Sequence, residues 1–268
     1  MSVQLGLAHL SALDLAPATL VRTAAETGFS SVGIRLIAVN DTTPGYPLMN
    51  KPTELRETLS ALRDTGIYVN DVEFIKFEPE IDPKALQPII DTAAELGARN
   101  IIVAPYDDLF SRLGANLAQF SEMAQASGIN VVLEFFPWTP VKDLQICWDL
   151  VSQASDRLGI LVDSLHFNRS NSSIDLLKTI PQQRLPFAQL CDAPVQPNYT
   201  FEELIYAGRD ERLAPGLGEI PLVEIANALP AGTPISLEVP QLKKTAELGE
   251  KTVLTELFEN SQQFFERL

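Results

Sequence analysis

Four apolar segments in the second half of the chain each carry an oxygen-donating side chain at or near their end. Glu134 follows VVL, Asp163 follows GILV, Gln189 lies in PFAQL, and Glu238 lies in PISLEV. Carboxylates buried in such segments without compensation would be very costly. A divalent cation removes that cost, and oxygen donors suit Mg²⁺ or Mn²⁺ better than Zn²⁺. If the four segments are neighbouring strands, they predict one metal site.

A structural explanation competes with the metal for each residue taken alone. A single buried Glu134 or Glu238 is more often paired with a neighbouring arginine or backbone amide. Four oxygen donors at a similar height on four successive strands are harder to explain by separate pairings. The set therefore favours a metal site, because barrel enzymes place their active sites at the carboxyl ends of the strands.

Further polar residues follow the strands expected in the first half of the chain. His9 ends the first strand, Arg35 ends the second, and Glu73 lies on the third. We expect these three side chains to contact a substrate. The alternatives are packing for His9 and an ion pair of Glu73 with Arg35 or Lys76.

Two arginines, Arg209 and Arg212, lie in the segment GRDERLAPGLGEIP. Arginine can hold a carboxylate, a phosphate or vicinal hydroxyl groups through paired donors. We expect both to bind substrate, the alternative being solvated ion pairs with Asp210 or Glu211. Phe136 and Trp138 are candidates for an apolar wall, although ordinary core packing explains them equally well.

The elements that must position these residues follow one repeating pattern, a helix ending in glycine and then a short apolar strand. The glycines are Gly28, Gly66, Gly97, Gly128 and Gly159. A glycine just past a helix end adopts the left-handed conformation at little cost. The spacing of about 31 residues matches one strand–helix unit with its loops. Adding strands in 5–10, 185–192 and 235–240 gives eight, which predicts a (β/α)8 barrel.

The helices between the strands are visible as well. One starts at Pro17, and another has Asp82 as its N-cap candidate with Pro83 at its first position. The segment 192–220 contains no obvious long helix, so we expect an extended loop with short helical turns. No linker divides residues 1–268, which we interpret as a single domain. An open doubly wound sheet is the alternative fold, and the eighth strand argues against it.

Composition restricts the function classes. A formal charge of −15 argues against nucleic acid or an anionic membrane as a partner. Cys147 and Cys191 are the two cysteines, so no disulfide framework is expected. No signal peptide or apolar run of roughly 18 residues is apparent, so we expect a cytoplasmic protein. A small-molecule substrate is the expected partner, and assembly into a homo-oligomer is compatible with the composition.

The segments LEFFP, LVDSLHF, AQLCDAP, RLAPGLGEIPL and SLEVP together resemble the xylose isomerase-like superfamily of sugar phosphate isomerases and epimerases. The resemblance covers essentially the whole chain. It implies Glu134, Asp163, Gln189 and Glu238 as ligands of one metal ion, Mn²⁺ or Mg²⁺. It also implies Glu134 and Glu238 as acid/base groups. His166, from the Asp-x-x-His pair, is implied as a metal-proximal or substrate-contacting group and is a further catalytic candidate.

Two departures from the family pattern bear on function. The seventh-strand ligand is Gln189 in place of histidine, similar to hydroxypyruvate isomerases, inosose dehydratases and some 3-dehydroshikimate dehydratases. The chain contains only two histidines, His9 and His166. A three-zinc nuclease site of this superfamily therefore cannot be assembled.

The resemblance implies a metal-dependent isomerase or epimerase of a small sugar, sugar phosphate or hydroxy-ketone. A metal acting as a Lewis acid would stabilise an enediolate while a carboxylate removes the α-proton. The alternative is a dehydratase or lyase of a keto-polyol, such as an inosose-like or dehydroshikimate-like substrate. A catalytically silent sugar-binding barrel is a third hypothesis, but it predicts a missing ligand, and all four positions hold donors.

Overall fold

Eight parallel strands close into a barrel within residues 4–267, the part of the chain that the computed structural model describes. Each strand pairs with its neighbours in chain order, and β8 pairs with β1 to close the ring. The predicted (β/α)8 barrel is confirmed. The strands are β1 (Leu5–Leu7), β2 (Ser31–Arg35), β3 (Tyr68–Phe77), β4 (Asn100–Pro105), β5 (Asn130–Glu134), β6 (Leu158–Asp163), β7 (Ala188–Leu190) and β8 (Ile235–Leu237).

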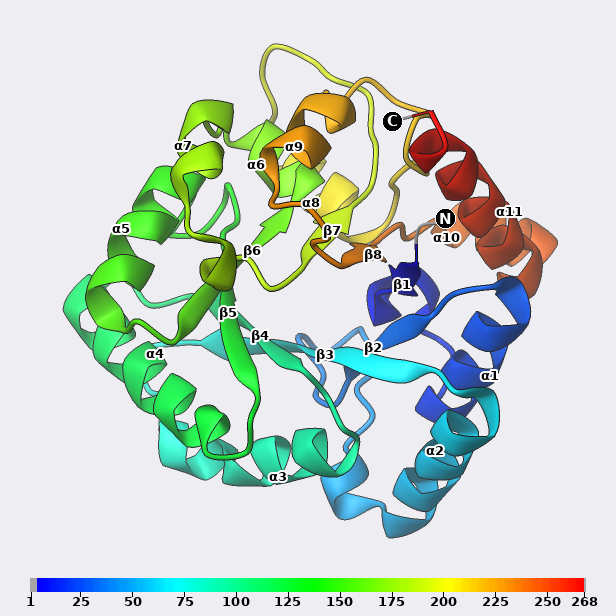
Figure 1. Cartoon of the computed structure of the whole chain (residues 1–268), viewed down its shortest axis with the longest axis horizontal. Helices are drawn as coiled ribbons and strands as arrows, with labels where there is room; N and C mark the ends of the chain where they lie inside the picture. Colours follow the sequence, from blue (N-terminus) through cyan, green and yellow to red (C-terminus); the bar gives the residue numbers. More distant parts are fainter. Residues whose placement is uncertain (1–3, 268) are drawn as a thin grey trace.

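Helices form an outer ring around the strands, and α11 packs next to α1 (Figure 1). The α-helices are α1 (Pro17–Thr27), α2 (Pro52–Thr65), α3 (Gln87–Glu95), α4 (Phe110–Gln125), α5 (Leu144–Ala154), α6 (Ser164–Arg169), α7 (Ile174–Thr179), α8 (Phe201–Arg209), α9 (Leu222–Ala228), α10 (Leu242–Leu248) and α11 (Glu250–Phe265). Short 3₁₀ helices are η1 (His9–Ala12), η2 (Leu48–Asn50), η3 (Pro83–Leu86) and η4 (Gln182–Arg184). No helix among the described residues is both long and apolar enough to cross a membrane.

The helix-ending glycines are confirmed in four of the five repeats. Gly28, Gly66, Gly97 and Gly128 have φ angles of 102°, 75°, 69° and 73°, the left-handed region that glycine adopts without a steric penalty. The prediction for Gly159 is wrong, because this residue lies within β6. A Cβ there would approach Val132 Cγ1 at 3.0 Å and the Arg184 carbonyl at 3.2 Å. Close packing, and not a helix end, therefore accounts for glycine at this position.

The long segment after β7 contains a regular helix that the sequence interpretation missed. Helix α8 is nine residues long and begins with a reciprocal capping box, in which Thr200 and Glu203 each bond the other's backbone N–H. Asp192 anchors the rest of the segment by accepting hydrogen bonds from the backbone N–H groups of Gly216 and Ile220. The segment is thus held in place over the carboxyl end of the barrel.

An apolar layer lies directly beneath part of the polar barrel end. Ile102, Val132, Leu161 and Phe187 form a separate buried cluster. Three of them precede Glu134, Asp163 and Gln189 by two positions. Because side chains two apart on a strand point to the same face, this cluster is the floor under those three polar residues.

Candidate active site

The four predicted ligand residues lie at the same end of four adjacent strands. Glu134 ends β5, Asp163 ends β6 in register with Gln189 on β7, and Glu238 directly follows β8. All four are buried, with exposed fractions between 0% and 7%. Only Asp163 and Gln189 are direct register partners, since Glu134 pairs with Leu161 and Gln189 pairs with Ser236. The four side chains are nevertheless all buried at the carboxyl end of the barrel.

Arg212 binds two of the four side chains directly. Its Nη1 lies 2.7 Å from Asp163 Oδ2 and its Nη2 lies 2.9 Å from Glu238 Oε2. Gln189 Nε2 donates to Glu238 Oε1 at 3.3 Å. One guanidinium thus connects the carboxylates of β6 and β8, and the amide of β7 fixes the second oxygen of Glu238.

The protein engages all three nitrogens of Arg212. Besides the two carboxylates, Nε donates to the Ala207 carbonyl, Nη2 to the Gly208 carbonyl, and Nη1 to the Glu238 carbonyl. Four of the five guanidinium N–H donors thus make hydrogen bonds to protein oxygens, and Nη2 also forms the ion pair with Glu238. Arg212 lines the cavity, but its contacts are with the protein, which makes it a positioning residue for Asp163 and Glu238.

The buried carboxylates differ in their acidity. Burial, and then the charges of Glu238 and Asp163, raise the pKa of Glu134 well above its ordinary value. Burial raises the pKa of Glu238 to about 8, even though Arg212 opposes the shift. Burial also raises the pKa of Asp163, but Arg212 and His166 lower it by more, so the pKa is below its ordinary value. With all three ionised, two negative charges remain uncompensated by Arg212.

His166 lies against Glu134 and is enclosed by aromatic rings. Its Nε2 is 3.6 Å from Glu134 Oε1, and its ring makes edge contacts with Phe136 and Trp138 at centroid distances of 4.7 and 5.1 Å. Burial lowers the pKa of His166 to about 4, so the ring is neutral at pH 7. Its Nδ1 is buried and has no hydrogen-bond partner.

The donor set fits a divalent cation. Ligand atoms of Glu134, Asp163 and His166 lie within 4.8 Å of one another. The amide oxygen of Gln189 is buried without a hydrogen-bond partner, a costly state that a cation would relieve. A divalent cation would also balance the two negative charges that remain beside Arg212 when all three carboxylates are ionised. The arrangement adds His166 to the metal-binding candidates, in agreement with the metal-proximal position that the resemblance implies.

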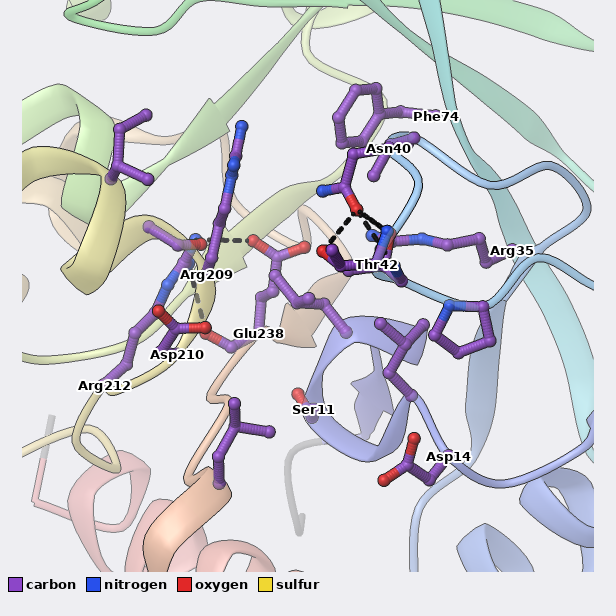
Figure 2. Close-up of a pocket in the computed structure, with 18 of the residues that line it drawn as sticks. Ser11, Asp14, Arg35, Asn40, Thr42, Phe74, Arg209, Asp210, Arg212 and Glu238 are labelled. Atoms are coloured by element: carbon purple, nitrogen blue, oxygen red, sulfur yellow. Dashed lines mark hydrogen bonds and ion pairs between the residues drawn. The ribbon is translucent and has the colours of Figure 1, made fainter.

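A cavity of about 710 Å³ opens above this cluster. Figure 2 shows its lining, in which Glu238 and Arg212 face the segment that carries Asn40 and Thr42. Of the predicted substrate-binding residues, Arg35, Arg209 and Arg212 line it. The catalytic candidates Glu134, Glu238 and His166 line it as well.

His9 and Glu73 are not among the lining residues, and protein partners occupy both. His9 Nδ1 accepts the Arg35 backbone N–H at 2.8 Å, and His9 Nε2 bonds the Leu15 carbonyl. Burial lowers the pKa of His9 to about 3, so the ring stays neutral. Glu73 accepts the backbone N–H groups of His9 and Leu10 and pairs with Arg35 at 3.0 Å. Their geometry supports a structural role in holding Arg35, one of the alternatives weighed from the sequence.

Several lining residues were not singled out as substrate contacts. Lys76 had been considered only as a partner for Glu73, yet it lines the cavity with its amino group over the Tyr106 ring at 5.1 Å. Phe74 joins Phe136 and Trp138 on an aromatic wall. Lys76 and Phe74 could have been identified as lining residues from the sequence, because both lie near the carboxyl end of β3. Nothing in the sequence indicates that the turn at 40–43 reaches the cavity.

Comparisons with known proteins agree with this architecture. Residues 21–257 match the family model described as xylose isomerase-like TIM barrel. A solved structure of the IolI protein, described with a binding zinc atom, superposes with a TM-score of 0.77 at 18% identity, covering 99% of this chain and 97% of that one.

Two curated relatives match part of the chain. An inosose isomerase of Bacillus velezensis is 24% identical over 152 residues, which are 53% of this chain and 52% of that protein. A 3-dehydroshikimate dehydratase of Pseudomonas putida is 30% identical over 129 residues, 46% of this chain and 20% of that protein. The matched segments thus span about half of the first relative and a fifth of the second.

Proposed function

Because the chain belongs to the xylose isomerase-like TIM barrel family, we propose that it is a metal-dependent isomerase or epimerase of a small keto sugar or hydroxy-ketone. The observation that carries the proposal is the buried layer of three carboxylates and one amide oxygen that Arg212 neutralises only in part. Relatives in this family with curated functions are enzymes that act on sugar- or polyol-like compounds.

We assign one divalent ion to Glu134, Asp163, Gln189 and Glu238, with Mn²⁺ or Mg²⁺ as the ion that an oxygen-rich shell favours. When bound, such an ion would act as a Lewis acid toward a substrate carbonyl and its neighbouring hydroxyl group. The imidazole of His166, which lies next to Glu134, would also suit Zn²⁺.

The proton transfers are assigned to Glu134 and Glu238. Both oxygens of Glu238 are engaged, Oε2 by Arg212 and Oε1 by Gln189, which fixes the direction of its carboxylate. Glu134 accepts no hydrogen bond from the described residues, and the neutral ring of His166 lies 3.6 Å from its Oε1. Glu134 is therefore free to take up a proton from a substrate carbon. Glu238 is held in a fixed position, from which it would transfer a proton to or from the side of the substrate that faces it.

The aromatic wall contributes binding and excludes water. Phe74, Phe136 and Trp138 line the cavity, and Phe136 and Trp138 contact the His166 ring beside Glu134. A substrate whose carbon skeleton packs on these rings would displace water from around Glu134 and His166. Charged groups then interact more strongly, because the local dielectric constant falls.

The second candidate is a dehydratase of a keto-polyol, which the similarity to 3-dehydroshikimate dehydratase supports. The same proton removal would serve both reactions, and only the fate of a β-hydroxyl group separates them. Incubation with inosose and with 3-dehydroshikimate in deuterated water, read by NMR and mass spectrometry, distinguishes the outcomes. Deuterium uptake without a change of formula indicates isomerisation, whereas loss of water with new ultraviolet absorbance indicates dehydration. A metal-loaded protein that does neither with any keto sugar or keto-polyol contradicts the proposal.

A further inference from the structure

The cations that line the cavity differ in whether a carboxylate neutralises them. Arg212 forms ion pairs with Asp163 and Glu238 and donates hydrogen bonds to backbone carbonyls. Lys76 and Arg209, by contrast, form no ion pair with any carboxylate in residues 4–267. Acidic residues outnumber basic ones by 35 to 20 in this chain, so carboxylate partners are abundant. Two unpaired cations that line the same cavity are consistent with a ligand that brings its own negative charge.

Arg35 provides the second and independent observation. Its side chain is 2% exposed and lines the cavity, and Nη2 donates to Glu73 Oε1 at 3.0 Å. Its Nε is buried and has no hydrogen-bond partner. A buried guanidinium donor without an acceptor is unfavourable, so a ligand that supplies an acceptor would be stabilised here. In Figure 2 the side chain of Arg35 extends toward Asn40 and Thr42 at the edge of the cavity.

Arg35 and Lys76 come from neighbouring strands, on the side of the barrel away from Glu134, Asp163 and Glu238. Arg35 ends β2 and packs over Phe74 at 5.7 Å, and Lys76 lies on β3 over Tyr106 at 5.1 Å. On this side Glu73 pairs with Arg35, whereas Lys76 has no carboxylate partner among the described residues. A negative group on a ligand would be repelled by the carboxylates of β5 to β8 and attracted to Lys76.

We propose that the substrate is an anion, whose carboxylate or phosphate group binds Arg35 and Lys76 while Arg209 approaches from the end of α8. This inference rests on the proposed function, because it assumes that the reacting carbonyl group of the substrate faces the carboxylate layer. The anionic group would then lie at the other end of the substrate. A planar guanidinium and an ammonium are the side chains that proteins use for both anions. The site therefore selects among keto sugars and keto-polyols by charge.

The test compares each anionic compound with its neutral counterpart. Calorimetric titration of the metal-loaded protein would measure affinities for 3-dehydroshikimate and its methyl ester, and for ribulose 5-phosphate and ribulose. The two pairs separate a carboxylate from a phosphate. The Lys76→Gln variant removes one positive charge at the proposed subsite, and Arg209→Gln removes the other positive charge that has no carboxylate partner. Lys84→Gln is the matched control, because Lys84 is exposed on η3 and lies outside the cavity.

We expect the anionic member of at least one pair to bind at least about tenfold more tightly than its neutral counterpart, the range for a charged hydrogen bond. Lys76→Gln should reduce that ratio about tenfold, and Lys84→Gln should leave it unchanged. The inference would be overturned if the anionic and neutral members of both pairs bound with similar affinity, or if no anion bound. It would also be overturned if Lys76→Gln left the ratio of the two affinities unchanged. The proposed function fails differently, through lack of divalent metal binding or of solvent exchange with neutral and anionic ketones alike.

Discussion

Asp71 offers a perturbation whose size follows from the structure. It lies on β3 two residues before Glu73, is 0% exposed, and has one hydrogen bond, from Asn70 Nδ2 to Oδ2. Its Oδ1 is buried without a partner, and no cation pairs with the carboxyl group within the described chain. Burial, and then the charge of Glu73, raise the pKa of Asp71 from 3.8 to about 7.

The sign of the pH dependence follows from proton uptake in the two states. Between pH 4 and 7 the folded chain keeps a proton on Asp71 that the unfolded chain has released. Stability therefore falls as pH rises through this window. Each pH unit corresponds to about 1.4 kcal/mol, so between pH 5 and pH 8 the loss from this group is about 3 kcal/mol. Asp71→Asn keeps the shape of the protonated carboxyl group and cannot ionise, so it should escape that loss.

Urea denaturation of the metal-free wild type and of Asp71→Asn at pH 5 and pH 8 tests this prediction. The variant's free energy of unfolding, relative to wild type, should improve by about 3 kcal/mol between the two pH values. Asp108→Asn is the control at an exposed aspartate, and its relative stability should not change. An Asp71→Asn effect that is the same at both pH values would refute the reasoning, because Asp71 would then be ionised in the folded protein throughout.

Three further substitutions test the candidate site. Arg212→Met leaves Asp163 and Glu238 buried without their counterion and should cost about 3–5 kcal/mol of unfolding free energy; a change below about 1 kcal/mol would contradict the positioning role. Gln189→His should raise the affinity for Zn²⁺ relative to Mn²⁺ at least about tenfold in equilibrium dialysis; an unchanged ratio would remove Gln189 from the shell. Glu238→Gln keeps an oxygen for the metal, so occupancy should fall modestly while turnover and solvent-deuterium exchange fall by roughly 10²–10⁴-fold. Normal turnover by metal-loaded Glu238→Gln would show that this carboxylate transfers no proton.

The parts of the fold that depend on local backbone preference were readable from the sequence. Glycines beyond helix ends need a left-handed conformation, so Gly28 and Gly128 report their positions directly. Gly159 follows the same spacing but fills a tight contact with Val132, and spacing alone does not distinguish the two causes. Helix α8 was missed because it is only nine residues long, although its sequence is amphipathic and a capping box of Thr200 and Glu203 marks its start.

The site was predictable as far as strand register determines it. Glu134, Asp163, Gln189 and Glu238 were brought together by counting along parallel strands, since neighbouring strand ends meet at one barrel face. The partners of each arginine and lysine side chain were not predictable, because they lie on segments that are far apart in the sequence. The sequence predicts that Arg212 binds substrate, but all three of its nitrogens are engaged by Asp163, Glu238 and backbone carbonyls.

The most direct test of the account is the position of a bound metal ion. A crystal soaked in Mn²⁺ and measured at the manganese absorption edge should show one anomalous peak. We expect it within about 2.0–2.6 Å of oxygens from Glu134, Asp163, Gln189 and Glu238, with Arg212 still bound to Asp163 and Glu238. A fully soaked crystal with no peak among these four side chains would contradict the central claim.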